Sequence, residues 1–256
     1  MIRHNPKSII VFPIVFLFIM AGCQKTKIEV SDSFESPGLS KIWSTDRMES
    51  RSFEIQSKVV RSGKSAAKIT LRTGDIVETA TEKDKATERD ELMEHMELYS
   101  VEGSKYEFQF SIFLPDTFPI VPTRLVLAQW KQFCPTGPCE EYSPILALRY
   151  QSGKLFITLQ TDSGRHTLWE VREEVRNRWL DFVFQVRFSR KSDGEVLAFL
   201  NGKDIVQYKG ITSYADTYWF LPVKNRYYFK MGLYRDRIPE PMCIYLDEYR
   251  KTEMVE

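Results

Sequence analysis

Three segments of the chain place side chains that can bind acids or move protons at every second position. In residues 88–95, Arg89, Glu91 and His95 are separated by even numbers of residues. Because successive side chains of a β-strand point to opposite faces, these three would share one face of a strand. An arginine can hold a carboxylate with two parallel hydrogen bonds, and a histidine can act as a general base. The plainer interpretation is an ion pair between Arg89 and Glu91 beside an ordinary surface histidine.

The other two segments repeat the pattern. A strand over residues 128–132 would place Gln129 and Lys131 on one face. A strand over residues 227–234 would place core residues on one face and hydrogen-bonding residues on the other, namely Tyr228, Lys230, Gly232 and Tyr234. Gly232 would leave room for a ligand to approach the backbone. Each segment alone could be a solvated sheet face, but three segments with one polarity pattern favour a shared concave binding surface.

The elements that position these residues are predicted to be short β-strands. Apolar and β-branched runs are separated by turn signals such as Asn201-Gly202, which indicates a hairpin between alternating runs. Residues 75–89 are charged, lack an apolar stripe and predict an exposed loop, whereas residues 170–178 could form a short helix. We therefore expect a single all-β domain over residues 28–256, built from two packed antiparallel sheets. The expected strands cover residues 65–71, 91–99, 106–114, 124–129, 145–150, 154–160, 179–189, 195–200, 227–234 and 243–250.

Composition narrows the class of protein. The chain has 256 residues, of which 43% are hydrophobic and 28% are charged, so it can bury a sizeable core. The same figures exclude disordered, collagen-like and coiled-coil proteins. The 36 basic and 35 acidic side chains nearly cancel, which argues against nucleic acid as a main partner.

The first residues predict an export signal. A basic start is followed by an apolar run that is too short for a comfortable membrane span. The run ends in Met20-Ala21-Gly22-Cys23, which resembles a bacterial lipobox with Met20 at the usual leucine position. Residues 1–22 would then be a lipoprotein signal peptide, and residues 23–27 a lipidated Cys23 with a polar tether. The protein would be exported and lipid-anchored, at the outer membrane or the periplasmic face; the alternative is a plain cleaved signal.

The remaining cysteines fit an exported chain. Cys134 and Cys139 enclose a tight turn and could form a disulfide, or they could be two separate thiols. Cys243 lies between apolar residues and is predicted to be a buried small side chain rather than a reactive thiol.

Several motifs resemble those of jelly-roll polysaccharide lyases. Residues 89–92 resemble their R-x-E-L strand, and residues 228–234 are similar to their Y-F-K-x-G-x-Y strand. Residues 129–131 stand where alginate-lyase relatives carry Q-[IV]-H. Residues 179–210 and 245–247 look like the heparin lyase I and glucuronan lyase branch. The resemblance implies a β-jelly roll, a concanavalin-like sandwich of two antiparallel sheets.

The resemblance also implies β-elimination of a uronate-containing, acidic polysaccharide, with no cofactor required for the chemistry. Arg89 and Gln129 would neutralise the uronate carboxylate as charge develops on it. Tyr234 would protonate the leaving glycosidic oxygen, and it could also take the C5 proton. Lys230 would contact a substrate carboxylate. The other residues expected to contact substrate are Lys131, Glu91, Tyr228 and Trp130.

One position departs from the family pattern. The relatives carry a histidine two residues after the glutamine, and this chain has Lys131. A lysine needs a strongly lowered pKa to act as a base near neutral pH. Three possibilities remain: Tyr234 acts as both base and acid, His95 serves as the base or neutralising group, or the site only binds.

Two other functions and one metal site stay open. A non-catalytic sandwich of the laminin-G or concanavalin type would hold sugar on aromatics such as Trp130, Trp219 or Tyr218. A glycoside hydrolase needs two carboxylates that flank the scissile bond, and the spacing of the acids in residues 88–91 does not match the laminarinase pattern. A structural calcium ion could be held by oxygen ligands brought together from both ends of the chain, Asp32, Glu35 and Asp247.

Overall fold

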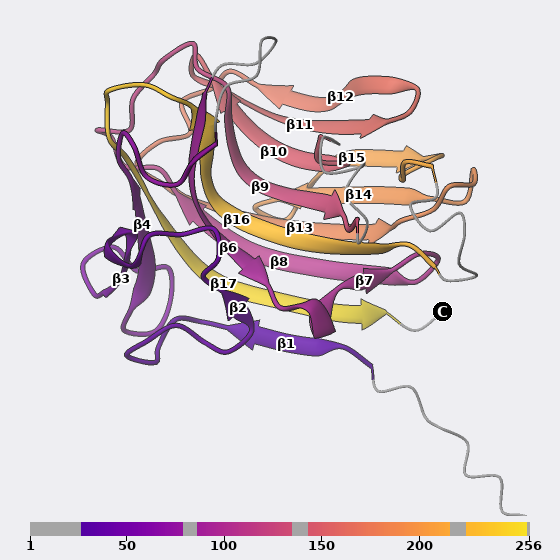
Figure 1. Ribbon diagram of the computed structural model, residues 1–256, viewed down its shortest axis with the longest axis horizontal. Helices are drawn as coiled ribbons and strands as arrows, with labels where there is room; N and C mark the ends of the chain where they lie inside the picture. The colour runs from indigo at the N-terminus through magenta and orange to yellow at the C-terminus, as the bar shows by residue number, and fades with distance from the viewer. Residues whose placement is uncertain (1–26, 79–85, 135–142, 216–223, 255–256) are drawn as a thin grey trace, which may run out of the picture.

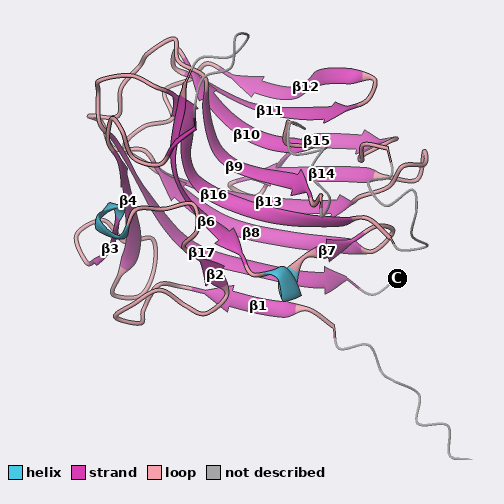
Figure 2. Ribbon diagram, viewed as in Figure 1, coloured by secondary structure: helices cyan, strands magenta, loops and turns pink. Residues whose placement is uncertain are grey.

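The computed structural model describes residues 27–78, 86–134, 143–215 and 224–254. Over these ranges the chain forms strands β1 to β17 and two short 3₁₀ turns, η1 (Ser50–Ser52) and η2 (Met96–Leu98), and it has no α-helix. Figure 2 shows how completely strands dominate the fold. In the same ranges no helix is long and apolar enough to span a membrane. The all-β prediction is confirmed.

The strands form two antiparallel sheets that pack face to face (Figure 1). The first, which we call the β8 sheet, also includes β1 (Glu29–Asp32), which pairs with β17. In order, its other strands are β15 (Lys203–Lys209), β14 (Glu195–Leu200), β13 (Trp179–Arg187), β8 (Lys105–Phe113), β17 (Met242–Met254), β4 (Ala66–Leu71) and β3 (Phe53–Gln56).

The second sheet, called the β16 sheet, contains the three segments singled out by the sequence. In order, its strands are β12 (Gly164–Val171), β11 (Lys154–Thr161), β10 (Leu146–Gln151), β9 (Leu125–Gln132), β16 (Arg226–Asp236), β6 (Thr87–Glu94) and β2 (Trp43–Ser44). Two short strands, β5 (Val77–Glu78) and β7 (Ser100–Val101), pair with β6 and β16. The segments at residues 88–95, 128–132 and 227–234 therefore lie on the neighbouring strands β6, β9 and β16.

The core lies between the sheets and is rich in aromatic rings. Trp130 of β9 is its largest fully buried side chain, with ring centroids 4.7 Å from Phe184 and 4.9 Å from Phe229. Along β16, Phe229, Met231 and Leu233 all point into this core and are fully buried. Alternation therefore turns Tyr228, Lys230 and Tyr234 to the opposite side, which we call the outer face of the β16 sheet.

Gly232 does not leave room for a ligand, as the sequence suggested, but allows two strands to approach closely. Its φ is +147°, and a Cβ atom there would lie 2.3 Å from the carbonyl oxygen of Asp90 on β6. The space beside Gly232 is thus filled by the neighbouring strand, not left for a ligand. On its other side, β16 shifts register against β9 between Met231 and Tyr234. The glycine allows β6 to approach at this irregularity.

Two secondary-structure predictions were wrong, and the structure decides a third that the sequence left open. The strand expected at residues 91–99 begins earlier, at Thr87, and ends at Glu94, where η2 follows. The loop expected over residues 75–89 contains β5, the first residues of β6 and a fully buried Asp75. Residues 170–171 end β12, and no helix follows them before β13.

Candidate active site

The outer face of the β16 sheet holds a buried polar cluster centred on Glu91. Its carboxylate is only 1% exposed and is bound by Lys230 Nζ at 3.1 Å and Arg89 Nη1 at 3.5 Å. Gln129 donates a hydrogen bond from Nε2 to the other oxygen, Oε1. Burial by itself would raise the pKa of Glu91, but the charges of Lys230 and Arg89 and the Gln129 hydrogen bond hold it below its usual value. β6, β9 and β16 each contribute to this cluster.

Lys230 responds in the opposite sense. Burial, together with the nearby charges of Arg89 and Lys131, lowers its pKa to about 8, although Glu91 opposes the shift. Lys230 therefore loses its proton more readily than an exposed lysine. Lys131 is half-buried on the same face as Gln129, and its Cα pairs with that of Tyr228.

Tyr234 lies at the edge of the cluster. Its Cα pairs with that of Arg89 on one side and Val126 on the other. The Arg89 guanidinium lies 4.3 Å from the ring centroid, and that of Arg124 lies 5.7 Å away. The ring is half-buried, and the hydroxyl makes no hydrogen bond with any residue that the structure describes. Its oxygen is thus available to a substrate, and positive charge lies beside it.

The structure brings most of the predicted residues together. Arg89, Gln129 and Lys230 each contact Glu91, Tyr234 stacks on Arg89, and Lys131 lies near Lys230. Tyr228 is on the same face and stacks on Tyr99 at a centroid distance of 5.2 Å. Burial raises the pKa of Tyr228 well above its usual value, so this phenol keeps its proton.

Two predicted residues stand apart. Trp130 is fully buried between the sheets, so the expectation that it contacts sugar was wrong. His95 comes after the end of β6, where it no longer follows the strand's alternation, and its side chain is exposed. Its backbone N–H binds the carbonyl of Ile42. No hydrogen bond or ion pair joins its side chain to the Glu91 cluster within the described part of the chain.

The core side of β6 carries carboxylates that the sequence pattern did not predict. Glu88 pairs with Arg235 at 2.6 Å, and Glu94 accepts hydrogen bonds from Lys251 and Tyr249, all buried. The inner face of this strand is therefore largely charged, unlike the apolar inner face of β16. Sequence offered one signal: three of the four inward positions of this strand, 88, 90 and 94, are acidic, and only Leu92 is apolar.

Asp90 and Asp75 form a second buried acidic site. Asp90 accepts a 2.7 Å hydrogen bond from the backbone N–H of Glu49, while its other oxygen, Oδ2, is buried without a partner. Burial and the neighbouring Asp75 raise the pKa of Asp90 to about 7. Burial also opposes ionisation of Asp75, but its contacts with Arg51 and the backbone of Arg72 hold its pKa below the usual value. The pair is thus arranged to hold one proton.

The three carboxylates predicted to bind calcium are each engaged separately. Asp32 accepts from Trp43 Nε1 at 2.9 Å, Glu35 from Lys64 N at 2.8 Å, and Asp247 from Arg61 N at 3.0 Å. Among the described residues, no group of three or more acidic, histidine or cysteine side chains could hold a metal. Their geometry therefore does not support the calcium prediction.

The structure describes two of the cysteines, Cys134 and Cys243. Cys134 is disulfide-bonded, whereas its predicted partner Cys139 lies outside the described residues. Cys243 is free and half-buried, and burial raises its pKa, which fits an unreactive thiol. Cys23, Tyr218 and Trp219 also lie outside the described residues.

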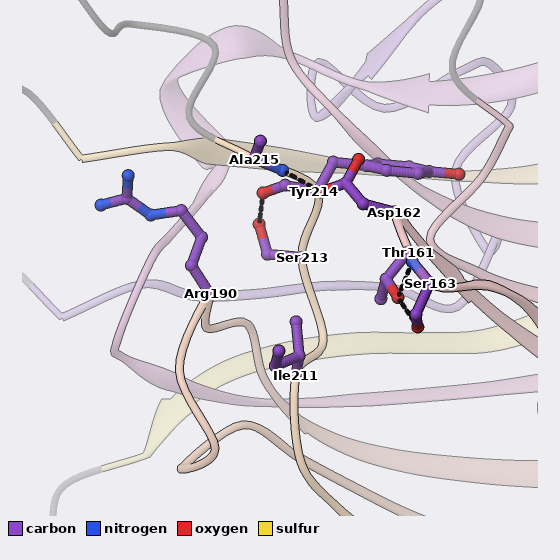
Figure 3. A pocket seen from close by; sticks show the side chains of 8 residues that line it. All are labelled: Thr161, Asp162, Ser163, Arg190, Ile211, Ser213, Tyr214 and Ala215. Carbon is purple, nitrogen blue, oxygen red and sulfur yellow. Dashed lines mark hydrogen bonds between the residues drawn. The ribbon is translucent and has the colours of Figure 1, made fainter.

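Two cavities lie away from the cluster. One, of about 410 Å³, opens where three loops meet at one end of the sandwich (Figure 3). There Asp162 accepts a 2.7 Å hydrogen bond from Ala215 N, and Arg190 binds Glu102. The other, of about 350 Å³, adjoins Cys243. Neither contains a residue of the Glu91 cluster.

Comparisons with known proteins identify the family. No curated protein matches the chain. The fold is similar to that of an endo-β-1,4-glucuronan lyase from the fungus Trichoderma reesei, with a TM-score of 0.65 and 16% identity over 82% of this chain and 91% of that one. It is also similar to the family 7 alginate lyase A1-II′, with a TM-score of 0.57 and 16% identity over 80% and 85% of the two chains. At these identities the likeness concerns the fold. The polysaccharide lyase family model, however, matches residues 34–250, and the chain belongs to this polysaccharide lyase family.

Proposed function

We propose that this lyase cleaves a uronate-containing polysaccharide by β-elimination on the outer face of the β16 sheet. The observation that carries the proposal is the placement of Tyr234. Its ring lies against the Arg89 guanidinium, which also contacts Glu91, and its hydroxyl has no hydrogen-bond partner among the described residues. The glucuronan and alginate lyases with a similar fold act on uronate polymers, which supports the same substrate class here.

The cluster supplies donors for the uronate carboxylate. Abstraction of the C5 proton moves negative charge onto that carboxylate, and donors aimed at it lower the barrier. The amide of Gln129 has two N–H groups, and only one is needed for its bond to Glu91. Arg89 places a guanidinium nitrogen 3.5 Å from Glu91, and its fixed positive charge favours a carboxylate that gains negative charge nearby. We therefore assign Glu91 to positioning these donors rather than to binding substrate itself.

Tyr234 carries the proton transfer in this proposal. As the phenolate it takes the proton from C5, the C4–O bond breaks as the C4=C5 double bond forms, and the resulting phenol gives the proton to the leaving glycosidic oxygen, which regenerates the phenolate. Positive charge on Arg89 and Arg124 beside the ring offsets the negative charge that the phenolate carries before and after the proton transfer. His95 has no part in this scheme because it lies outside the cluster.

The test is an assay of the purified protein on glucuronan, alginate, heparin and hyaluronan. Elimination forms an unsaturated uronide that absorbs in the ultraviolet, whereas hydrolysis does not. We expect this absorbance to grow with at least one polymer. Binding of an acidic polysaccharide without any product would instead support a binding module. New reducing ends without absorbance would support a hydrolase.

We also propose that the chain is exported and anchored through lipidated Cys23, on the basis of its signal-like first residues. Expression in a bacterium with a labelled fatty acid tests this. The label should enter the wild-type protein and be absent from the Cys23→Ala variant. Equal labelling of both proteins would contradict the proposal.

A further inference from the structure

One buried cation of the described residues differs from the others. Arg149 on β10 is 5% exposed, yet no carboxylate of the described chain lies within ion-pair distance of it. The remaining buried cations are all paired: Arg89 and Lys230 with Glu91, Arg235 with Glu88, and Lys251 with Glu94. Since a buried charge without a counter-ion is costly, this exception needs an explanation.

The surroundings of Arg149 are those of an anion site. Its Nε donates a 2.9 Å hydrogen bond to Thr158 Oγ1, which fixes the plane of the guanidinium. The nitrogens Nη1 and Nη2 have no hydrogen-bond partner in the described chain. Neither of them is fully buried, so both are accessible from the surface. Burial, together with the positive charges of Arg165 and Arg124, lowers the pKa of Arg149 to about 10, so it still carries its charge at neutral pH.

Arg149 is also in line with the proposed reaction centre. Its Cα pairs with Val126 on β9, Val126 pairs with Tyr234 on β16, and Tyr234 pairs with Arg89 on β6. The side chains at these register positions share the outer face, because Leu148 and Leu233 beside them point into the core. β10 is two strands from β16, about 10 Å at the usual strand spacing. A polysaccharide that crosses the strands would therefore meet Arg89, Tyr234 and Arg149 in succession.

We propose that Arg149 binds the carboxylate of a second uronate, next along the polymer from the one that loses its C5 proton. Arg149 would thereby determine specificity, since polymers with a neutral sugar at that place would leave the buried guanidinium without an anion. This inference rests on the proposed function.

The test compares two substrates and two variants. One substrate is a uronate oligosaccharide, and the other is the same oligosaccharide with its carboxyls partly reduced to neutral sugars. We expect Arg149→Gln to lower kcat/KM on the fully charged substrate by about 10- to 100-fold, the range for a lost hydrogen bond to a charged group. On those reduced oligosaccharides that the wild type still cleaves, the variant should match the wild type, because the partner carboxylate is gone. Arg165→Gln is the control; it removes a nearby exposed charge that is bonded to Gln160, and it should leave both rates unchanged.

Two results would overturn the assignment. Equal losses on both substrates would indicate a structural role, and wild-type rates on both would indicate no role. The midpoint of thermal unfolding shows whether Arg149→Gln folds. If it does not, Arg149→Lys keeps the charge but loses two-point binding, and should show an intermediate loss confined to the charged substrate. A wild type with no elimination on any uronate would contradict the proposed function instead, and calorimetric affinities for the same two oligosaccharides would then decide the role of Arg149.

Discussion

The guanidinium of Arg89 lies 4.3 Å from the ring centroid of Tyr234, and the two residues are Cα partners across β6 and β16. A cation over an aromatic face is attracted to it, so each side chain holds the other in place. The same guanidinium reaches Glu91 at 3.5 Å. The phenol and the carboxylate-binding donors are therefore parts of one unit, and a change at either end should affect the reaction.

Replacing Tyr234 with phenylalanine tests the proton-transfer role. The ring and its contact with Arg89 are kept, and only the hydroxyl is lost. We expect the elimination rate to fall by roughly 10²-fold or more, the scale of a lost acid–base group. Affinity for an intact oligosaccharide, measured by calorimetry, should change little. Elimination at the wild-type rate would refute the mechanism.

Replacing Glu91 with glutamine tests the buried cluster. The substitution leaves Lys230 and Arg89 buried without their common counter-ion. We expect the free energy of unfolding in urea to fall by about 3–5 kcal/mol, as for other broken buried ion pairs. Glu54→Gln is the matched control, because Glu54 pairs with Lys68 on the surface and should contribute less than about 1 kcal/mol. Similar losses in the two variants would mean that the Glu91 cluster does not stabilise the fold.

The part of the site predicted from sequence is the part that follows strand alternation. Lys230 and Tyr234 are four residues apart on one strand, so they share a face. The apolar residues that alternate with them face the core, which fixes that face as the outer one: Phe229, Met231 and Leu233. The same rule places Trp130 in the core, because it lies between Gln129 and Lys131. Sugar stacking was expected of Trp130 from its residue type, and that expectation conflicted with the alternation.

The rest depended on partners distant in sequence. Glu94 points into the core because Lys251 and Tyr249 of β17 meet it there, more than 150 residues away. A carboxylate in a strand gives no sign of such a partner and is expected to face water. The expectation that His95 shares a strand face with Glu91 failed for a local reason, because periodicity does not fix the residue at which a strand ends. The alignment of Arg149 with Tyr234 across β9 depends on the register of β10 against β9, which cannot be deduced from the sequence alone.

The Asp90–Asp75 pair predicts a stability that depends on pH. The folded state holds a proton on Asp90 up to a pKa of about 7, whereas the unfolded chain releases it near the ordinary aspartate pKa of 3.8. Because the folded state binds more protons in this window, stability should decline as pH rises from about 4 to 7. Asp90→Asn keeps an acceptor for Glu49 N and can donate to Asp75. We expect it to be more stable than wild type by roughly 1–3 kcal/mol at pH 8, with little difference at pH 4, in urea titrations. A wild type and variant with parallel pH profiles would contradict this.

By the resemblance of residues 129–131 to the Q-[IV]-H motif, Lys131 takes the place of a histidine, and its replacement by histidine tests which group moves the proton. Lys131 lies close enough to Lys230 to help lower its pKa, and it shares the outer face with Gln129. If Tyr234 transfers the proton, Lys131 only contributes charge, and Lys131→His should keep at least the wild-type elimination rate. A histidine with an ordinary pKa of about 6.5 could also add a base near neutral pH. Lys131→Gln separates the two effects, because it removes the charge without adding a base, and it should be slower than Lys131→His. Collapse of elimination in both variants, with unfolding midpoints unchanged, would show that Lys131 itself is essential and that Tyr234 does not act alone.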